Sequence, residues 1–289
     1  MSLTNKLWNS FITLYLFNKS DMKTIVAPVT VFSLALATTH SFSRFCYVVL
    51  WIWTLLLQVT VSNQSIGNSP EEDAINKPNR PIPSRRISLE AARLFRWLLI
   101  PIDLAVSVLL GAFPAGVCVS FMVAVYSEGR GHSHWFTKNL CCAFFYAAFE
   151  YGGTTVAEGT GDLSPKQVAA IIGSASIIMT TIHAQDFRDN EGDALRGRST
   201  FTLAYPTIAR ISMPVTLIGW SIALYLFSEV NFIAKAFLVA MSIYVSARFS
   251  FLHSAKDDKW SYDLYNIWLS TAHYALSTLD VNLITAMTA

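Results

Sequence analysis

The chain has 289 residues, of which 53% are hydrophobic and only 14% are charged, and its formal net charge is +2. Soluble domains carry about 25% charged residues, so this composition excludes a soluble globular fold and predicts a protein that faces membrane lipid. The small net charge gives no reason to expect a nucleic-acid partner, and no segment indicates an obligate protein partner. The four cysteines lie in apolar stretches without disulfide or zinc spacing, which indicates packing residues.

Apolar stretches dominate the chain from its beginning to its end. The run 7–17 is short and lacks a cleavage site, so it predicts an interfacial helix and not a signal peptide. Nine later stretches can each cross about 30 Å of hydrocarbon. We therefore predict an all-α, polytopic membrane bundle of about nine transmembrane helices. The bundle is expected to form one domain over residues 1–289. These stretches are 22–42, 45–63, 88–110, 112–127, 138–158, 165–186, 205–228, 231–252 and 262–288.

The loops between these stretches are unequal in charge. The N-terminus and the loops after the second, fourth, sixth and eighth stretches carry most of the Lys and Arg residues, whereas the opposite side carries only Arg44 and Lys166. The positive-inside rule therefore places the loops 63–87 and 186–200 in the cytosol. Because no transit peptide is visible, we expect an endomembrane location for this multi-pass protein.

The first polar loop, 63–87, combines acids with bases. Three consecutive carboxylates, 71–73, stand a few residues before Lys77 and Arg80. Carboxylate oxygens suit Mg²⁺, which usually keeps several waters and bridges to substrate phosphates, and the basic side chains suit phosphate oxygens. The alternative is an ordinary solvated loop, because mixed charge runs are common at membrane surfaces.

The second polar loop, 186–200, carries Asp186, Asp189 and Asp193 at spacings of three and four. If the preceding helix continues, all three lie on one face, where like charges repel unless a cation sits between them. A metal site is therefore favoured over a solvated turn. Both acidic loops leave the membrane on the same side, so their carboxylates can converge.

Further polar residues stand close to these loops or inside the spans. Tyr126 and Lys138 flank the loop after the fourth stretch and can hold phosphate oxygens, although an interfacial tyrosine belt with positive-inside lysine explains them equally well. Asp103 and Glu150 lie within spans, where carboxylates are costly and indicate function by default. Glu150 lines a reaction chamber or is a protonated structural acid.

These motifs together resemble those of the UbiA-type superfamily of intramembrane prenyltransferases. That family has nine spans and two Asp-rich loops, after spans 2 and 6, which bind Mg²⁺ and an isoprenyl diphosphate. The segment 76–84 resembles the run after the family's first motif, and 186–193 with 197–200 matches its second motif closely. Tyr126 with Lys138 resembles its phosphate-contact element at a longer spacing. The resemblance covers nearly the whole chain.

The first motif departs from the family pattern, Asn-Asp-x-x-Asp-x-x-x-Asp. Laid on Asn63, its three Asp positions fall on Gln64, Gly67 and Glu71. The chain is more similar to the divergent branch of membrane terpene cyclases. This branch implies ionisation of a linear isoprenyl diphosphate, such as farnesyl or geranylgeranyl diphosphate, and release of a cyclic terpene. The alternative is prenyl transfer to an aromatic or other acceptor. A transporter is disfavoured, because an ion path needs polar groups at successive depths of the membrane, whereas the acids of this chain cluster at one face.

The resemblance also implies roles for individual residues. Asp186, Asp189 and Asn63 are the expected catalytic residues, and Glu71 is expected to matter more than Asp73 because it aligns with the family motif. Aromatic faces can stabilise a carbocation, although plain packing is the alternative for each aromatic residue. The expected Mg²⁺ ligands are Asn63, Glu71, Asp73, Asp186, Asp189 and Asp193. The expected substrate-binding residues are Lys77, Arg80, Tyr126, Lys138, Arg188, Phe145, Tyr146, Phe149 and Glu150.

Overall fold

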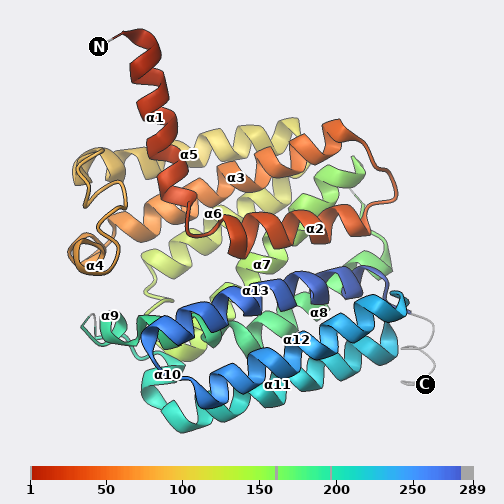
Figure 1. The fold of residues 1–289 in the computed structure, drawn as a ribbon. Coiled ribbons are helices and arrows are strands. Elements are labelled where there is room, and N and C mark those ends of the chain that lie inside the picture. Colours follow the sequence, from red (N-terminus) through yellow and green to blue (C-terminus); the bar gives the residue numbers. More distant parts are fainter. Residues whose placement is uncertain (1, 160–161, 196, 281–289) are drawn as a thin grey trace.

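The computed structural model describes residues 2–159, 162–195 and 197–280. Within these ranges all the long elements are helices, and they lie side by side in one bundle (Figure 1). The predicted all-α class is therefore confirmed. The long helices are α2 (Ala27–Leu36), α3 (Phe42–Ser65), α5 (Leu89–Leu109), α6 (Phe113–Ser127), α7 (Trp135–Glu158), α8 (Pro165–Thr181), α11 (Pro206–Phe227), α12 (Phe232–Phe251) and α13 (Ala255–Ser277).

Each of the nine predicted spans corresponds to one of these helices in the described part of the chain, with ends that differ. A π-helical turn, Met22–Val26, precedes α2 and forms the first part of its span. By length and composition alone, four stretches can cross a membrane. These are Phe42–Ser65, Pro165–Leu195, Pro206–Phe227 and Phe232–Phe251. The remaining helices are shorter or carry more polar side chains, many of which are buried inside the bundle.

Local sequence signals set several helix ends. Ser41 Oγ accepts a hydrogen bond from the backbone N of Arg44 at 3.2 Å and starts α3. Ser164 and Gln167 form a reciprocal capping pair that starts α8. Gly159 ends α7 with a φ of 75°, a left-handed conformation that glycine adopts without the steric cost of a Cβ atom. These ends fix where each helix meets the polar loops.

The last predicted span, 262–288, differs from the structure. Its helix α13 begins earlier, because the side chain of Ser254 caps a first turn made of charged residues. Asp258 in that turn accepts hydrogen bonds of 2.6 and 2.7 Å from Arg210 of α11, so polar residues enter the bundle as part of the helix. Residues 281–289 of the predicted span lie outside the described residues.

The helix α7 occupies the middle of the bundle. It packs against α2, α3, α6 and α8, and most of its side chains are buried. The pair α11 and α12 instead exposes large apolar side chains, among them Ile211, Val215 and Ile243, as expected for a lipid-facing surface. The residues of α7 are therefore placed where a chamber enclosed by other helices can form.

The N-terminal helix α1 (Leu3–Asn18) leaves the bundle at a steep angle to the long helices (Figure 1). Its first half exposes Leu7, Trp8 and Phe11. Its C-terminal end is held to α3, because Asn18 Nδ2 donates to the carbonyl of Trp53 at 2.9 Å. This arrangement agrees with an amphipathic helix that lies in the membrane interface.

Candidate active site

The two acidic loops meet at one end of the bundle. The first loop folds into the short helix α4 (Ser69–Asn76), and the second contains the short helix α9 (Asn190–Leu195). Figure 1 shows both helices at the same end, and they contact each other. Loops that are more than a hundred residues apart in sequence thus form one polar surface.

The second loop is not a simple continuation of α8. That helix ends at Thr181 and is followed by two 3₁₀ turns, Ile182–Gln185 and Phe187–Asp189, before α9 begins. A 3₁₀ helix has three residues per turn instead of 3.6, so the direction of each side chain changes along the loop. The three aspartates therefore do not line one α-helical face but contact different basic partners.

Two of these aspartates are almost fully buried beside a base. Lys138 Nζ of α7 donates to Asp186 Oδ1 at 2.5 Å, and the two side chains are 6% and 2% exposed. Arg198 Nη1 donates to Asp193 Oδ1 at 3.1 Å. The first contact joins the predicted phosphate-contact element on α7 to the second acidic loop.

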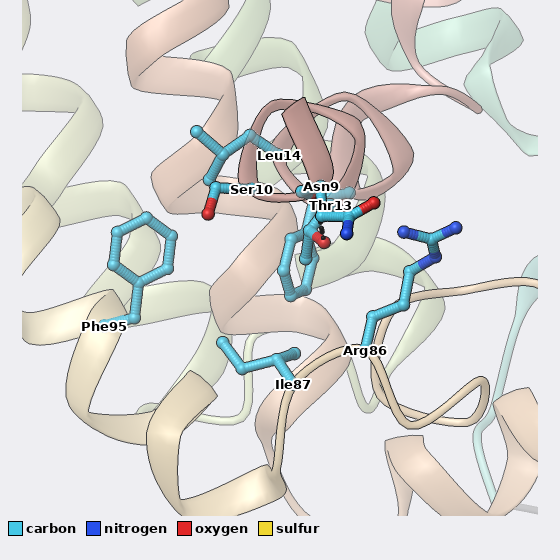
Figure 2. Close-up of a pocket in the computed structure, with 8 residues that line it drawn as sticks. Asn9, Ser10, Thr13, Leu14, Arg86, Ile87 and Phe95 are labelled. Atoms are coloured by element: carbon cyan, nitrogen blue, oxygen red, sulfur yellow. Dashed lines mark hydrogen bonds between the residues drawn. The ribbon is translucent and has the colours of Figure 1, made fainter. Parts of the chain in front are cut away.

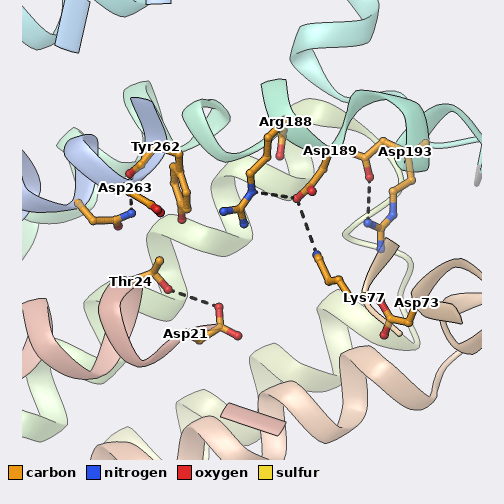
Figure 3. Close-up of polar contacts among 12 residues, drawn as sticks. Asp21, Thr24, Asp73, Lys77, Arg188, Asp189, Asp193, Tyr262 and Asp263 are labelled. Carbon is orange, nitrogen blue, oxygen red and sulfur yellow. Dashed lines mark hydrogen bonds and ion pairs between the residues drawn. The ribbon is translucent and has the colours of Figure 1, made fainter. Parts of the chain in front are cut away.

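Asp73 and Asp189 form a network with bases of both loops, in which Asp73 is buried and Asp189 is partly exposed (Figure 3). Lys77 Nζ lies 3.9 Å from Asp189 Oδ2, and Arg188 Nε donates to the same oxygen at 3.4 Å. Arg80 Nη1 donates to both carboxylate oxygens of Asp73, at 2.8 and 2.9 Å. Burial and the positive charge of Arg80 lower the pKa of Lys77 from its ordinary value. Such a concentration of bases favours a multiply charged anion.

The buried acids retain free coordinating oxygens. The Oδ2 atoms of Asp186 and Asp193 are buried without a hydrogen-bond partner, which is costly for a carboxylate oxygen. Among the described residues, no three His, Cys, Asp or Glu side chains converge on one point, because basic residues stand between the acids. Mg²⁺ needs only one or two protein carboxylates when water and phosphate supply its other ligands. The residues present therefore fit a magnesium–diphosphate group.

Asn63 and Tyr126 stand where two cavities meet. The first is polar, has a volume of about 550 Å³ and is lined by residues such as Asn68, Arg130 and Arg198. The second has a volume of about 130 Å³ and extends into the bundle. Both Asn63 and Tyr126 line both cavities. The polar opening and the inner cavity, here called the chamber, are thus adjacent.

The chamber wall is mainly apolar and aromatic. Phe145, Tyr146 and Phe149 of α7 line it, together with Tyr262 of α13. The rings of Tyr126 and Phe145 meet edge to face with centroids 5.9 Å apart. Aromatic faces at this spacing around the chamber suit an apolar chain and any cation formed on it.

Comparison with known proteins identifies this architecture. The model of the UbiA prenyltransferase family matches residues 25–270. The chain belongs to the UbiA prenyltransferase family. It is 34% identical over 266 residues to the fumagillin beta-trans-bergamotene synthase of Aspergillus fumigatus, with 91% of each chain covered. It is 30% identical over 199 residues to a polyprenyl transferase of Hericium erinaceus, covering 65% of this chain and 67% of the relative.

Solved structures agree with this family assignment. A UbiA homologue from Archaeoglobus fulgidus bound to GPP and Mg²⁺ superimposes with a TM-score of 0.64 at 14% identity, covering 92% of this chain and 99% of the homologue. The predicted UbiA-like fold is therefore confirmed, and the chain is a multi-pass integral membrane protein.

Within this UbiA bundle, the first motif is divided between two environments. Asp73 is 3% exposed and belongs to the ion-pair network, whereas Glu71 lies on the exposed side of α4. Gln64, which replaces the first aspartate of the family motif, is buried and donates to the carbonyl of Phe17 at 3.0 Å. Gln64 thus holds α1 in place. This placement favours Asp73 over Glu71 as the candidate metal ligand of the first motif.

Glu150 does not line the chamber. It is fully buried behind the aromatic wall, where Ser174 Oγ donates to its Oε1 at 2.6 Å and His273 Nε2 lies 3.4 Å from the same oxygen. The Ser174 hydroxyl and His273 Nε2 are also 3.0 Å apart. These three residues, the Glu150 cluster, join α7, α8 and α13. Their contacts agree with the structural alternative considered for Glu150.

Sequence reasoning missed several residues of the chamber wall: Asp21, Thr24, Gln185 and Tyr262. Gln185 immediately precedes a motif aspartate, and Asp21 stands at the start of the first span on the side of the motif loops. The positions of Gln185 and Asp21 near the motif loops could therefore have marked them as residues of the site. No pattern marks Tyr262, because α13 approaches the chamber only in the folded bundle.

A second groove of about 500 Å³ lies between α1 and α5 (Figure 2). It is lined by Asn9, Thr13, Phe17 and Phe95, and its one charged lining residue is Arg86. No acid lines this groove in the described part of the chain. The groove therefore does not fit a magnesium–diphosphate group, and the chamber beneath the ion-pair network is the better candidate.

Proposed function

We propose that this UbiA-family protein is a Mg²⁺-dependent terpene cyclase of the membrane. It would ionise a linear isoprenyl diphosphate, such as farnesyl or geranylgeranyl diphosphate, and release diphosphate and a cyclic terpene. The observation that carries the proposal is the aromatic chamber adjoining a polar opening, with Asn63 and Tyr126 shared between the two and with Arg198, the partner of Asp193, on the wall of the opening. The substrate's charged head and apolar tail match these two environments.

The network residues would bind the diphosphate. Lys77, Arg80 and Arg188 each exchange a carboxylate partner for a phosphate oxygen, so the freed carboxylates become available as metal ligands. Bound Mg²⁺ would supply charge stabilisation for the leaving diphosphate. The buried free oxygens of Asp186 and Asp193 are the strongest candidates to hold it, with Asn63, Asp73 and Asp189 as further ligands.

The chamber would control the fate of the carbocation. Loss of diphosphate breaks the allylic C–O bond and leaves a cation that water would otherwise capture. Phe145 and Phe149 present aromatic rings to this space, and a desolvated ring stabilises a cation by about 2 kcal/mol or more. The chain's own double bond is then the nearest nucleophile, which leads to ring formation.

Two observations favour cyclisation over transfer to an acceptor. The lining of the chamber is mostly apolar, so it offers few groups that could orient a separate polar acceptor beside the first prenyl carbon. The similarity to the bergamotene synthase also covers 91% of this chain, against 65% for the polyprenyl transferase. We further propose that the protein lies in an endomembrane and that its motif loops face the cytosol, in agreement with the distribution of basic residues.

The decisive experiment uses the purified full-length protein in detergent or liposomes. It is incubated with Mg²⁺ and either farnesyl or geranylgeranyl diphosphate, without any acceptor. We expect diphosphate release and a cyclic hydrocarbon detected by gas chromatography and mass spectrometry. Added hydroxybenzoate should not increase the rate. Diphosphate release that requires the acceptor would identify a prenyltransferase, and no release under either condition would contradict both activities.

A further inference from the structure

Asp21 is an acid on the chamber wall that belongs to neither family motif. It lies between α1 and the π-helical turn that leads into α2, and it lines the same cavity as Phe145 and Phe149. Among the described residues that line this cavity, Asp21 is the one carboxylate. A carboxylate in a mainly apolar and aromatic wall is costly unless it has a role or a partner.

The partners of Asp21 differ from those of the motif acids. Each motif acid of the network has a basic partner within 4.0 Å, whereas no such ion pair involves Asp21 in the described residues. Its one side-chain hydrogen bond is long, 3.4 Å from Thr24 Oγ1 to Asp21 Oδ1. Figure 3 shows the carboxylate apart from the ion pairs of the network. Asp21 is half-buried, so it can face the chamber and still exchange protons with water.

The reaction proposed above requires a proton acceptor in this place. Loss of diphosphate and ring closure leave a cyclic cation, which becomes a neutral hydrocarbon only when a neighbouring carbon loses H⁺. The electrons of the broken C–H bond then form the final double bond. A base must be in contact with the cation, so position is the first criterion for choosing it.

We propose that Asp21 is the base that takes this terminating proton. The inference rests on the proposed cyclase function. The carboxylate receives the proton and becomes a carboxylic acid, the cation becomes an alkene, and the proton then passes to water at the polar opening. Because Asp21 lines the same cavity as Phe145 and Phe149, its carboxylate borders the space in which the cation would form.

Other groups of the wall are less suited. The hydroxyl of Tyr146 donates its proton to the carbonyl of Thr24, and Tyr262 lies beneath the guanidinium of Arg188, 4.5 Å from the ring centroid, so both are occupied phenols. The motif acids are paired with bases in this structure and would hold Mg²⁺ in the proposed reaction. The departing diphosphate is the remaining competitor, and the test below separates it from Asp21.

The test compares Asp21→Asn with wild type and with Asp263→Asn. The side chain of Asp21 does not cap the following turn, so the isosteric amide should leave the local fold intact. Asp263 is a matched control, because it is a half-buried acid nearby that pairs with Lys23 and does not line the chamber. For each protein, diphosphate release and the hydrocarbon products are measured in the same reaction.

In Asp21→Asn we expect diphosphate release to continue at a rate of the wild-type order of magnitude. The amount of the wild-type hydrocarbon formed per diphosphate released should fall by about 10²-fold, because a positioned base contributes about this factor. Alcohols from water capture and alkenes with other double-bond positions should replace it. Asp21→Glu, which retains a carboxylate, should recover most of the hydrocarbon, and Asp263→Asn should resemble wild type.

An unchanged hydrocarbon yield in Asp21→Asn would overturn the proposal and leave the diphosphate as the base. Equal loss of diphosphate release and product would also overturn it, because Asp21 would then act in substrate binding or ionisation. If the wild-type protein itself releases no diphosphate, the cyclase function fails, and this outcome is distinct from a failure of the Asp21 role alone.

Discussion

The ion-pair network at the polar opening and the Glu150 cluster inside the bundle both bury carboxylates that keep an oxygen without a hydrogen-bond partner, but they differ in their partners and in their access to a cavity. In the network, buried acids contact Lys and Arg, and the network residue Arg198 lines the polar opening. In the cluster, Glu150 contacts a hydroxyl and an imidazole and lines neither the chamber nor the polar opening. Burial of an acid therefore does not by itself indicate a reactive site. An adjoining cavity and an excess of opposite charge distinguish the network.

The largest expected effect comes from removing an acid or the metal from the network. In Asp189→Ala, turnover of the prenyl diphosphate should fall by about 10³-fold, the upper range for loss of one group that stabilises transition-state charge. Excess EDTA should stop the wild-type reaction and added Mg²⁺ should restore it. Asp189 is about one-third exposed, so thermal unfolding should change little. Near-normal activity in this variant would remove the network from the mechanism.

A second experiment sharpens the comparison through stability. Asp186→Ala removes the partner of Lys138 and leaves a buried ammonium unpaired, whereas Asp189→Ala leaves its partners partly exposed. Breaking a buried ion pair on one side costs about 3–5 kcal/mol. We therefore expect a clear drop in the unfolding temperature for Asp186→Ala only, measured by thermal denaturation in detergent. A double variant that also replaces Lys138 by Met should recover part of this loss.

The two acids of the first loop provide a smaller contrast. Asp73→Ala should lower turnover by about tenfold or more, because it removes a charge-assisted partner inside the network. Glu71→Ala should have nearly wild-type activity, because Glu71 is exposed on α4. Initial rates of diphosphate release for the two variants provide the measurement. A larger loss of activity in Glu71→Ala than in Asp73→Ala would contradict this expectation. It would show that alignment with the family motif predicts the important acid better than burial in the fold does.

The smallest effect on activity is expected in the Glu150 cluster. Glu150→Gln preserves the size of the side chain and can still accept from Ser174, so turnover should stay within about twofold while stability falls by about 1–3 kcal/mol for an imperfectly satisfied buried group. The pair of measurements is the rate with saturating substrate and the unfolding temperature. A loss of activity comparable to that of Asp189→Ala would make the cluster part of the reaction and remove the distinction drawn above.

The sequence alone determined the membrane bundle and the end of the bundle at which its acidic loops lie. Stretches such as 45–63 and 205–228 are apolar over enough residues to require lipid, and this property depends only on local composition. The acids of 186–200 could be assigned to one end of the bundle in the same way, because loop charge follows the orientation of the spans. Hydrophobicity and charge are properties of each segment, so they can be read before folding.

The tertiary structure alone decided which of these residues act together. It paired Asp186 with Lys138 across two helices, set Asp73 inside the network and Glu71 outside it, and placed Glu150 behind the chamber wall. It also brought Asp21 to the chamber from the first span. Ion pairs and cavities depend on how distant helices approach one another and on where 3₁₀ turns redirect a side chain. No local pattern in the sequence encodes those distances.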